Sequence, residues 1–406
     1  MNKLTPRKFL SIMKNHHRLS SALFFVLGTV IFYACQKNET TETLTPSVDS
    51  LSQSRLAAFA NSPADNPTST AKVALGKMLF YDPILSGKKD VACATCHHPS
   101  TGYSDGLDLS IGVNATGFGT TRHFLSPNTI AFVKRNAQTI LNSGFNGMNA
   151  SGVYNPSTAP MFWDNRTQSL ENQSLGPIVT LEEMRGTTYS EAVALDSVVA
   201  RLRNITEYRT LFQAAFGNVT QAITAINLGK AIASFERTLI TNNSPYDRFQ
   251  RGDRTALTPQ QVQGMQSFRD AGCATCHSGD MFSDYQLHVL SVPDNLKNTA
   301  SDAGANNTYA FRTASLRNLQ FTAPFMHSGV FQDLNQVVGF YGRIAGGNSQ
   351  NPNVNIRQVD PLIRQVRIAG RQQEIIAFIN ALSDNSFDKT VPTRVPSNLN
   401  PGGNIK

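Results

Sequence analysis

Two copies of the pentapeptide Cys-Ala-Thr-Cys-His carry the clearest chemistry in this chain of 406 residues. One copy runs from Cys93 to His97 and the other from Cys273 to His277. In the C-x-x-C-H pattern, two thiols form thioether bonds to the vinyl groups of a haem, and the adjacent histidine supplies an axial nitrogen to the iron. The sequence therefore predicts two covalently bound c-type haems, and with them electron transfer or redox catalysis.

Redox disulfides, zinc sites and structural bridges also use a Cys-x-x-Cys pair. The identical repeat, with a histidine after each pair, favours haem attachment. The cysteine count agrees, because four of the five cysteines lie in the two motifs. The predicted attachment residues and proximal iron ligands are Cys93, Cys96, Cys273, Cys276, His97 and His277.

The fifth cysteine ends an N-terminal segment with the features of an export signal. Residues 1–21 are basic and contain no acid, and the apolar run at 22–34 is short for a membrane span. The sequence before Cys35 resembles a bacterial lipobox, which predicts a signal peptide over 1–35 and a lipid on Cys35. The alternative is an uncleaved anchor helix. Both interpretations predict an exported, periplasmic protein held on a membrane, with the outer membrane and the cell surface as options.

Charge and composition indicate a globular protein and imply no nucleic-acid partner. Loss of five basic residues with the export segment would lower the formal charge of +8 to +3, so the sequence implies no nucleic-acid partner. With 16% charged and 40% hydrophobic residues, the remainder is typical of a globular protein. Residues 36–66 are rich in Thr, Ser, Pro and Asn and predict a flexible tether. About 330 residues follow, which favours two domains.

Helical patterns flank both motifs. Apolar spacing predicts a short helix over 71–80, before the first motif, and a longer one over 221–240, after it. Thr-Pro-Gln-Gln at 258–261 is a capping box that opens a helix, which Gly272 ends just before the second motif. A last helix is predicted over 372–382.

These elements predict a mainly α fold, because almost no stretch alternates like a strand. The predicted architecture is two cytochrome c-like haem domains in tandem, with long loops. The first haem domain would span 67–250, the second 251–395, and a tail 396–406.

Several stretches outside the motifs carry a family resemblance. They are LGKMLFYDP (75–83) with SDG (104–106), FWDNR (162–166), AIASFER (231–237), FRTASLRN (311–318) and APFMHSG (323–329). Together they resemble the bacterial dihaem cytochrome c peroxidase and MauG family. The peroxidases reduce hydrogen peroxide with electrons from a small cytochrome c or copper protein. The MauG-like enzymes use the same two haems to oxidise residues of another protein.

The resemblance implies a peroxidatic site at the first haem. It places an acid–base glutamate at Glu183, beside Gln173 and Pro177, with Glu182 as the alternative register; such a group moves a proton between the peroxide oxygens. Trp163, the one tryptophan of the chain, falls where the family places an aromatic residue between the haems. There it can relay electrons, and a core position is compatible with that role.

Two ligand positions depart from the peroxidase pattern. The histidine that caps the first haem in many peroxidases is absent, since Val113 follows Ser-Ile-Gly. His123 lies in an insertion, and we expect it to lie on the surface or the site to be open; the alternative is that it acts as a substitute cap. Tyr341 replaces the axial methionine of the second haem, as in MauG-like proteins, with Met326 as the other candidate. Phenolate favours oxidised iron and would lower the potential of this haem.

The resemblance also implies Ca²⁺ between the domains. The matching positions are Asn136 and the backbone carbonyls near Arg312 and Ala314, and oxygen donors suit calcium. Ala314 stands where the family has proline. A homodimer is compatible with the resemblance.

These features predict a dihaem c-type peroxidase that reduces hydrogen peroxide to water with electrons from a small periplasmic redox protein. Electrons would enter at the His277 haem and cross by way of Trp163 to the His97 haem. One alternative is a MauG-like enzyme that uses peroxide to oxidise residues of a partner protein. A second is a non-enzymatic dihaem electron carrier.

Overall fold

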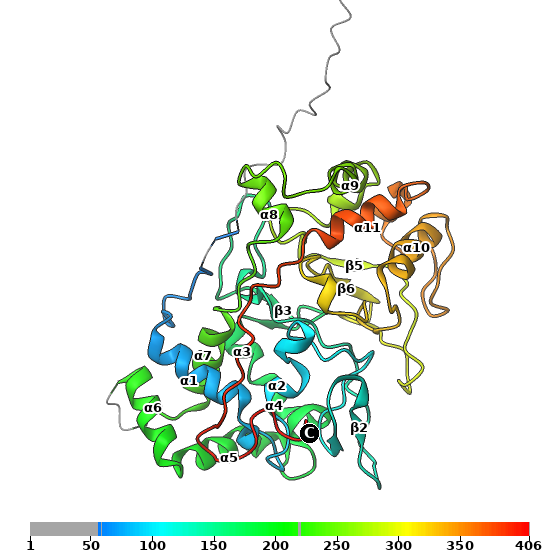
Figure 1. Ribbon diagram of the computed structural model, residues 1–406. Coiled ribbons are helices and arrows are strands. Elements are labelled where there is room, and N and C mark those ends of the chain that lie inside the picture. The colour runs from blue at the N-terminus through cyan, green and yellow to red at the C-terminus, as the bar shows by residue number, and fades with distance from the viewer. Residues whose placement is uncertain (1–55, 58, 218–220, 406) are drawn as a thin grey trace, which may run out of the picture. The chain divides into compact units, whose positions relative to one another are not determined.

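The computed structural model describes residues 56–57, 59–217 and 221–405. The predicted signal peptide, the lipid site at Cys35 and most of the tether lie outside these residues. Within the described part, helices dominate and strands are short, which confirms the mainly α fold (Figure 1). No helix there is long and apolar enough to cross a membrane.

A closely packed pair of helices supports the first motif. Helix α1 (Thr70–Tyr81) precedes α2 (Cys93–Cys96), which holds the cysteines of that motif. Helix α7 (Ala225–Glu236) packs along α1. A Cβ atom at Gly76 would overlap the carbonyl oxygen of Ala231, so glycine is what permits this close approach.

The second motif is supported in the same way. Helix α9 (Pro259–Asp270) begins at the predicted capping box of Thr258 and runs up to the motif. It packs along α11 (Gln372–Asn380). Here a Cβ atom at Gly264 would overlap the carbonyl oxygen of Glu374. The two halves of the chain therefore repeat one plan, with a glycine at each helix crossing.

Further elements fill the space around these pairs. The other α-helices are α3 (Leu170–Gln173), α4 (Gly176–Val179), α5 (Glu191–Arg203), α6 (Thr206–Phe216), α8 (Pro245–Gln250) and α10 (Leu334–Ala345). In the part of the chain that the structure describes, the strands form three antiparallel pairs: β1 (Ala115–Thr116) with β2 (His123–Phe124), β3 (Pro160–Met161) with β4 (Thr167–Gln168), and β5 (Leu287–Val289) with β6 (Ala310–Arg312). The sequence patterns did not predict α5, α6 or α10.

Each half has its own hydrophobic core. Phe235 of α7 belongs to the core around α1, and Phe378 of α11 belongs to the core around α9. Tyr246 of α8 packs in the second core. We therefore propose that the two haem domains meet near residue 244, a few residues before the predicted boundary at 250.

Leu56 and Asn66, near the end of the predicted tether, 36–66, are buried in the structure. Leu56 is buried in a small cluster with Phe145. The amide of Asn66 is fully buried and donates to the carboxylate of Glu171 at 2.8 Å. Because these contacts are made with residues far away in the sequence, the polar composition of the segment gave no sign of them.

The predicted tail, 396–406, returns to the first half of the chain (Figure 1, red trace). The N–H of Gly402 donates to the carbonyl of Tyr81 at 2.8 Å, and that of Asn404 donates to the carbonyl of Asp90 at 2.8 Å. The segment is held by backbone hydrogen bonds, so it needs no apolar periodicity of its own.

The helix crossing in the second half makes a testable prediction. Gly264→Ala should lower the free energy of unfolding by about 1–3 kcal/mol, because the new methyl group must push α9 away from α11. Gly339→Ala in α10 is the matched control, since a Cβ there meets only the end of the Arg343 side chain at 3.5 Å. Denaturant unfolding measures both variants, and equal stability would contradict the role of Gly264.

Candidate functional site

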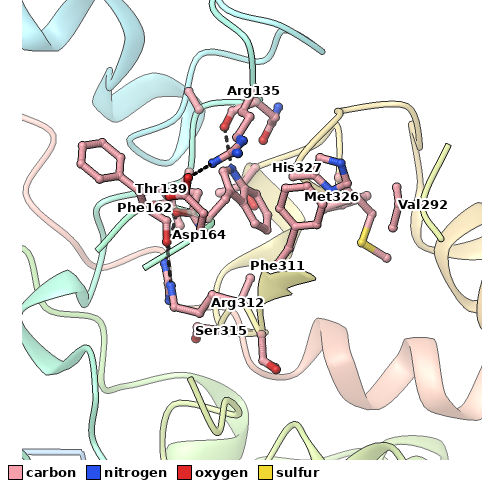
Figure 2. A pocket seen from close by; sticks show the side chains of 18 of the residues that line it. Arg135, Thr139, Phe162, Asp164, Val292, Phe311, Arg312, Ser315, Met326 and His327 are labelled. Carbon is pink, nitrogen blue, oxygen red and sulfur yellow. Dashed lines mark hydrogen bonds and ion pairs between the residues drawn. The ribbon is translucent and has the colours of Figure 1, made fainter. Parts of the chain in front are cut away.

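A cavity of about 710 Å³ lies between the two halves and reaches both motifs. This volume is within the range of ligand pockets, about 300–1,000 Å³. Figure 2 shows part of its wall, to which both halves contribute, among others Arg135 from the first and Arg312 from the second. The motif residues in the wall are Cys93, Cys96, His97, Cys273, Cys276 and His277.

The two motif histidines are oriented by the same kind of hydrogen bond. Nδ1 of His97 donates to the carbonyl of Tyr103 at 3.1 Å, and Nδ1 of His277 donates to the carbonyl of Phe282 at 3.0 Å. Because Nδ1 carries the proton, Nε2 keeps its lone pair for a metal. Burial lowers the pKa of both imidazoles, which keeps them neutral, the form that binds iron.

The four described cysteines are free thiols beside these histidines. Burial raises the pKa of Cys96 to about 12 and that of Cys273 to about 11, and it raises the pKa of Cys93 further. Neutral thiols in pairs, each pair followed by an imidazole with a free Nε2, fit the covalent attachment of one c-type haem at each motif.

Glu183 lies in the cavity wall beside the first motif, together with Gln173 and Pro177. It belongs to a single π-helical turn, Leu181–Arg185, a distortion common at functional sites. Burial raises the pKa of Glu183 to about 7, against the opposing effect of Arg166. Its carboxyl is thus close to half-protonated at neutral pH, as an acid–base group requires.

The π-helical turn is supported from behind by Gly112 and Val113. A Cβ atom at Gly112 would overlap the carbonyl oxygens of Glu182 and Glu183, so the two backbones touch. The N–H of Val113 donates to the carbonyl of Glu182 at 3.3 Å. Both glutamates reach the cavity wall.

Glu236 is a cavity residue that was not predicted. It sits on α7, is only 4% exposed, and its Oε2 has no hydrogen-bond partner. Burial raises its pKa to about 8, although Arg237 opposes the shift. Arg237 instead forms an ion pair with Glu171 at 2.7 Å. The signal in the sequence for a buried acid here is that Glu236 stands at the end of an otherwise apolar helix face.

Trp163 joins the two halves. Its indole Nε1 donates to the carbonyl of Asn136 in the first half at 2.9 Å. Its own carbonyl accepts the N–H of Arg312 in the second half at 2.7 Å. The ring also meets His327 edge to face, with centroids 6.4 Å apart. Trp163 is therefore held by hydrogen bonds to both halves, in the wall of the cavity that reaches both motifs.

His327 is a second cavity residue without a predicted role. Its ring stacks on Phe311, with centroids 3.5 Å apart and planes within 9° (Figure 2). Burial lowers the pKa of His327 to about 3, so the imidazole is neutral. Arg135 lies over the same Phe311 ring at 5.2 Å and pairs with Asp164 at 2.7 Å. Phe311 thus contacts both a neutral imidazole and a charged guanidinium.

Both candidate axial ligands of the second haem line the cavity. Tyr341 lies on α10, and burial, with the thiols of Cys273 and Cys276 adding to it, raises its pKa well above the usual value. Its phenol is neutral here, and a bound metal would have to displace the proton. Met326 has a left-handed backbone, with φ +69°, and also reaches the cavity.

The position of the missing histidine is filled by an apolar side chain. Val113 is buried in the first core. His123 is exposed on β2, and its Nδ1 donates to the carbonyl of Thr121 at 2.9 Å. Among the described residues, the histidines of the cavity wall are His97, His277, His288 and His327, and His123 does not join them.

The positions matched to calcium lie in the same wall. Asn136, Arg312 and Ala314 all line the cavity. The side-chain amide of Asn136 donates to the carbonyl of Leu107 at 2.8 Å. Among the described residues, the group of Cys, Asp and His side chains close enough to hold a metal ion is a different set, Cys276, Asp284 and His288. The three positions share the wall of one large cavity, which Asp164 and Asp302 also line.

Comparison with known proteins gives one consistent family. Residues 70–255 match the family described as di-haem cytochrome c peroxidase. The chain is 33% identical to cytochrome-c peroxidase IdrP1 of Pseudomonas sp. (strain SCT), over 79% of this chain and 83% of the relative. It is also 33% identical to methylamine utilization protein MauG of Methylorubrum extorquens, over 81% of this chain and 83% of the relative.

Solved structures of related proteins have a similar fold. A MauG-like protein associated with microbial copper homeostasis superposes with a TM-score of 0.63 at 26% identity, covering 81% of this chain and 93% of that one. The diheme peroxidase BthA from Burkholderia thailandensis has the same fold, with a TM-score of 0.60 at 21% identity, over 86% of this chain and 96% of that one. With two C-x-x-C-H motifs in one cavity and relatives aligned over most of both chains, this protein belongs to the di-haem cytochrome c peroxidase family, which includes MauG.

Proposed function

We propose that this protein is a dihaem c-type peroxidase that reduces hydrogen peroxide to water with electrons from a small redox protein, a cytochrome c or a copper protein. The observation that carries the proposal is Glu183, a carboxyl with a pKa of about 7 that faces the cavity and lies close enough to Cys93 and Cys96 to influence both thiols.

Each motif would hold one haem through its two cysteines and the Nε2 atom of its histidine. When bound, the haems supply the iron site for peroxide and the path for electrons. The reaction consumes one hydrogen peroxide, two protons and two electrons and releases two waters. The residues of the chain must therefore bind peroxide, move protons and let electrons cross the cavity.

Glu183 is suited to the proton movement. Its ionised form accepts a proton from one peroxide oxygen, and its protonated form returns that proton to the other oxygen as the bond breaks. A pKa near the working pH makes both forms available. The amide of Gln173 can orient the peroxide by hydrogen bonding, and Pro177 adds an apolar wall that limits water.

Trp163 is suited to the electron path. Its hydrogen bonds to Asn136 and Arg312 fix the indole between the two halves. We propose that electrons reach the second motif first and cross by way of this ring. We include Ca²⁺ at Asn136, Arg312 and Ala314 as a further part of the proposal, supported by their shared position in the cavity wall.

A MauG-like enzyme is the second candidate, and two observations favour it. Tyr341 lies beside the cysteines of the second motif, and Val113 stands where the capping histidine of many peroxidases lies. A phenolate ligand would stabilise oxidised iron at the second haem. Such an enzyme would use peroxide to oxidise residues of a partner protein.

We also propose that the protein is exported to the periplasm and lipid-anchored at Cys35. The proposal rests on the sequence before Cys35, outside the described residues, and on the need for an exported location in c-type haem attachment.

Glu183→Gln should slow steady-state peroxide turnover by about 10²-fold, because the amide can neither accept nor return the proton. In the parent protein the rate should also fall as the pH drops through about 7, since protonation removes the base form, and this limb should vanish in the variant.

The matched control is Glu182→Gln, the neighbouring glutamate that also reaches the cavity wall. It should keep most of the activity. Turnover with reduced cytochrome c measures both variants, and an unchanged rate in Glu183→Gln would remove this residue from the mechanism.

Tyr341→Phe should alter the absorption and electron paramagnetic resonance spectra of the second haem only, because the ring keeps its size but loses its oxygen donor. Met326→Leu is the parallel variant, since both side chains line the cavity. If Met326→Leu changes the spectra and Tyr341→Phe does not, the axial ligand is Met326.

A further inference from the structure

The two motifs, identical in sequence, differ in their access to solvent. Thr95 of the first motif is only 2% exposed, and its hydroxyl donates to the carbonyl of Gly402 at 2.7 Å. The C-terminal segment therefore covers the first motif. Thr275, the equivalent residue of the second motif, is exposed. A protein that delivers electrons can approach the second motif more closely than the first.

The surface next to the second motif is formed by residues 357–371. The N–H of Arg367 donates to the carbonyl of Ala271, two residues before the motif, at 3.0 Å. Ile363 and Val366 of this segment are buried and line the cavity together with Cys273. The segment is thus a thin wall, with the cavity on one side and solvent on the other.

The outer side of this wall is basic. Arg357, Arg364 and Arg367 are exposed, and Arg371 is partly exposed. We call these four residues the arginine rim. Asp360 is the one acidic residue of the segment, and its carboxylate is bound to His288 at 2.6 Å.

The arginine rim has no internal counter-charge. Within the described residues, none of its guanidinium groups forms an ion pair with a carboxylate. Arg367 donates instead to the carbonyl of Arg364 at 2.7 Å, and Arg371 donates to that of Arg367 at 3.3 Å. Asp270, exposed beside this surface, accepts from Gln266. Four like charges held on a short wall produce a positive field directed at solvent.

We propose that the arginine rim is the docking surface for a small electron-donor protein with an acidic face. This rests on the proposed function in one respect, that electrons enter at the second motif. Docking places the reduced metal centre of the donor over the thin wall. One electron would then leave the donor, which is oxidised, and would reduce the haem that the second motif would hold through His277; no proton is needed at this step.

Binding of a donor to the holoprotein is measured by titration calorimetry, which does not depend on peroxide chemistry. The probes are two oxidised proteins of opposite charge, a small acidic copper protein and a basic cytochrome c. The acidic probe should bind more tightly, and its affinity should fall as ionic strength rises from low to physiological values.

The test variant is Arg364→Glu with Arg367→Glu, and we expect at least a tenfold loss of affinity for the acidic probe. The control is Lys88→Glu with Arg209→Glu, which reverses the same number of exposed charges in the first half. It should change the affinity much less. Equal losses in the two variants, or tighter binding of the basic probe to the parent protein, would overturn the proposal.

Two further measurements separate the possible causes of failure. Stopped-flow reduction of the oxidised protein by the reduced acidic probe should slow in parallel with the binding. Peroxide turnover with a small neutral reductant tests the proposed function itself and should be unchanged in the arginine variant. If that variant instead loses binding to anionic lipid vesicles and keeps its donor affinity, the surface serves a membrane and the proposal is wrong.

Discussion

The structure depends on one hydrogen bond made twice, from a motif histidine to a backbone carbonyl. His97 donates to Tyr103 and His277 to Phe282, and in each case Nε2 is left available for iron. The loop after each motif must return to supply that carbonyl, and the helix pair beside it must hold the motif in place. The glycine crossings of α1 with α7 and α9 with α11 meet that need in the two halves.

The two motifs are supported in the same way but differ in the residues around them. The first motif is covered by the C-terminal segment and faces Glu183, a carboxyl that burial keeps protonatable near neutral pH. The second motif is open to solvent at Thr275 and faces Tyr341. Trp163 is hydrogen-bonded to both halves and stands between them. The covered first motif suits a small substrate, and the accessible second motif suits a partner protein.

The sequence predicted most of what depends on local patterns. The capping box at Thr258 and the helices beside each motif follow from short-range rules, and the structure confirms them. Helix α10 was missed, since two glycines and adjacent valines weaken the helical pattern of 334–345.

Features that arise from contacts distant in sequence could not be predicted from local patterns. Gly402 contacts Tyr81 and Thr95 through hydrogen bonds of its own backbone N–H and C=O groups. Every residue except proline carries both groups, so the sequence of side chains does not indicate such contacts. Glu236 stands at the end of an apolar helix face, but its burial without a hydrogen-bond partner for Oε2 can be seen only in the packed structure. The role of Glu183 was predicted from the family resemblance, because its local sequence alone is typical of a helix surface.

In the proposed reaction, peroxide is reduced with electrons from a donor protein. The stoichiometry of steady turnover with a small, reduced acidic donor protein tests this, with the peroxide consumed and the donor oxidised followed together. Sustained turnover is expected, with two donor molecules oxidised for each hydrogen peroxide. Peroxide consumption with little oxidation of the donor would contradict it and favour the MauG-like alternative.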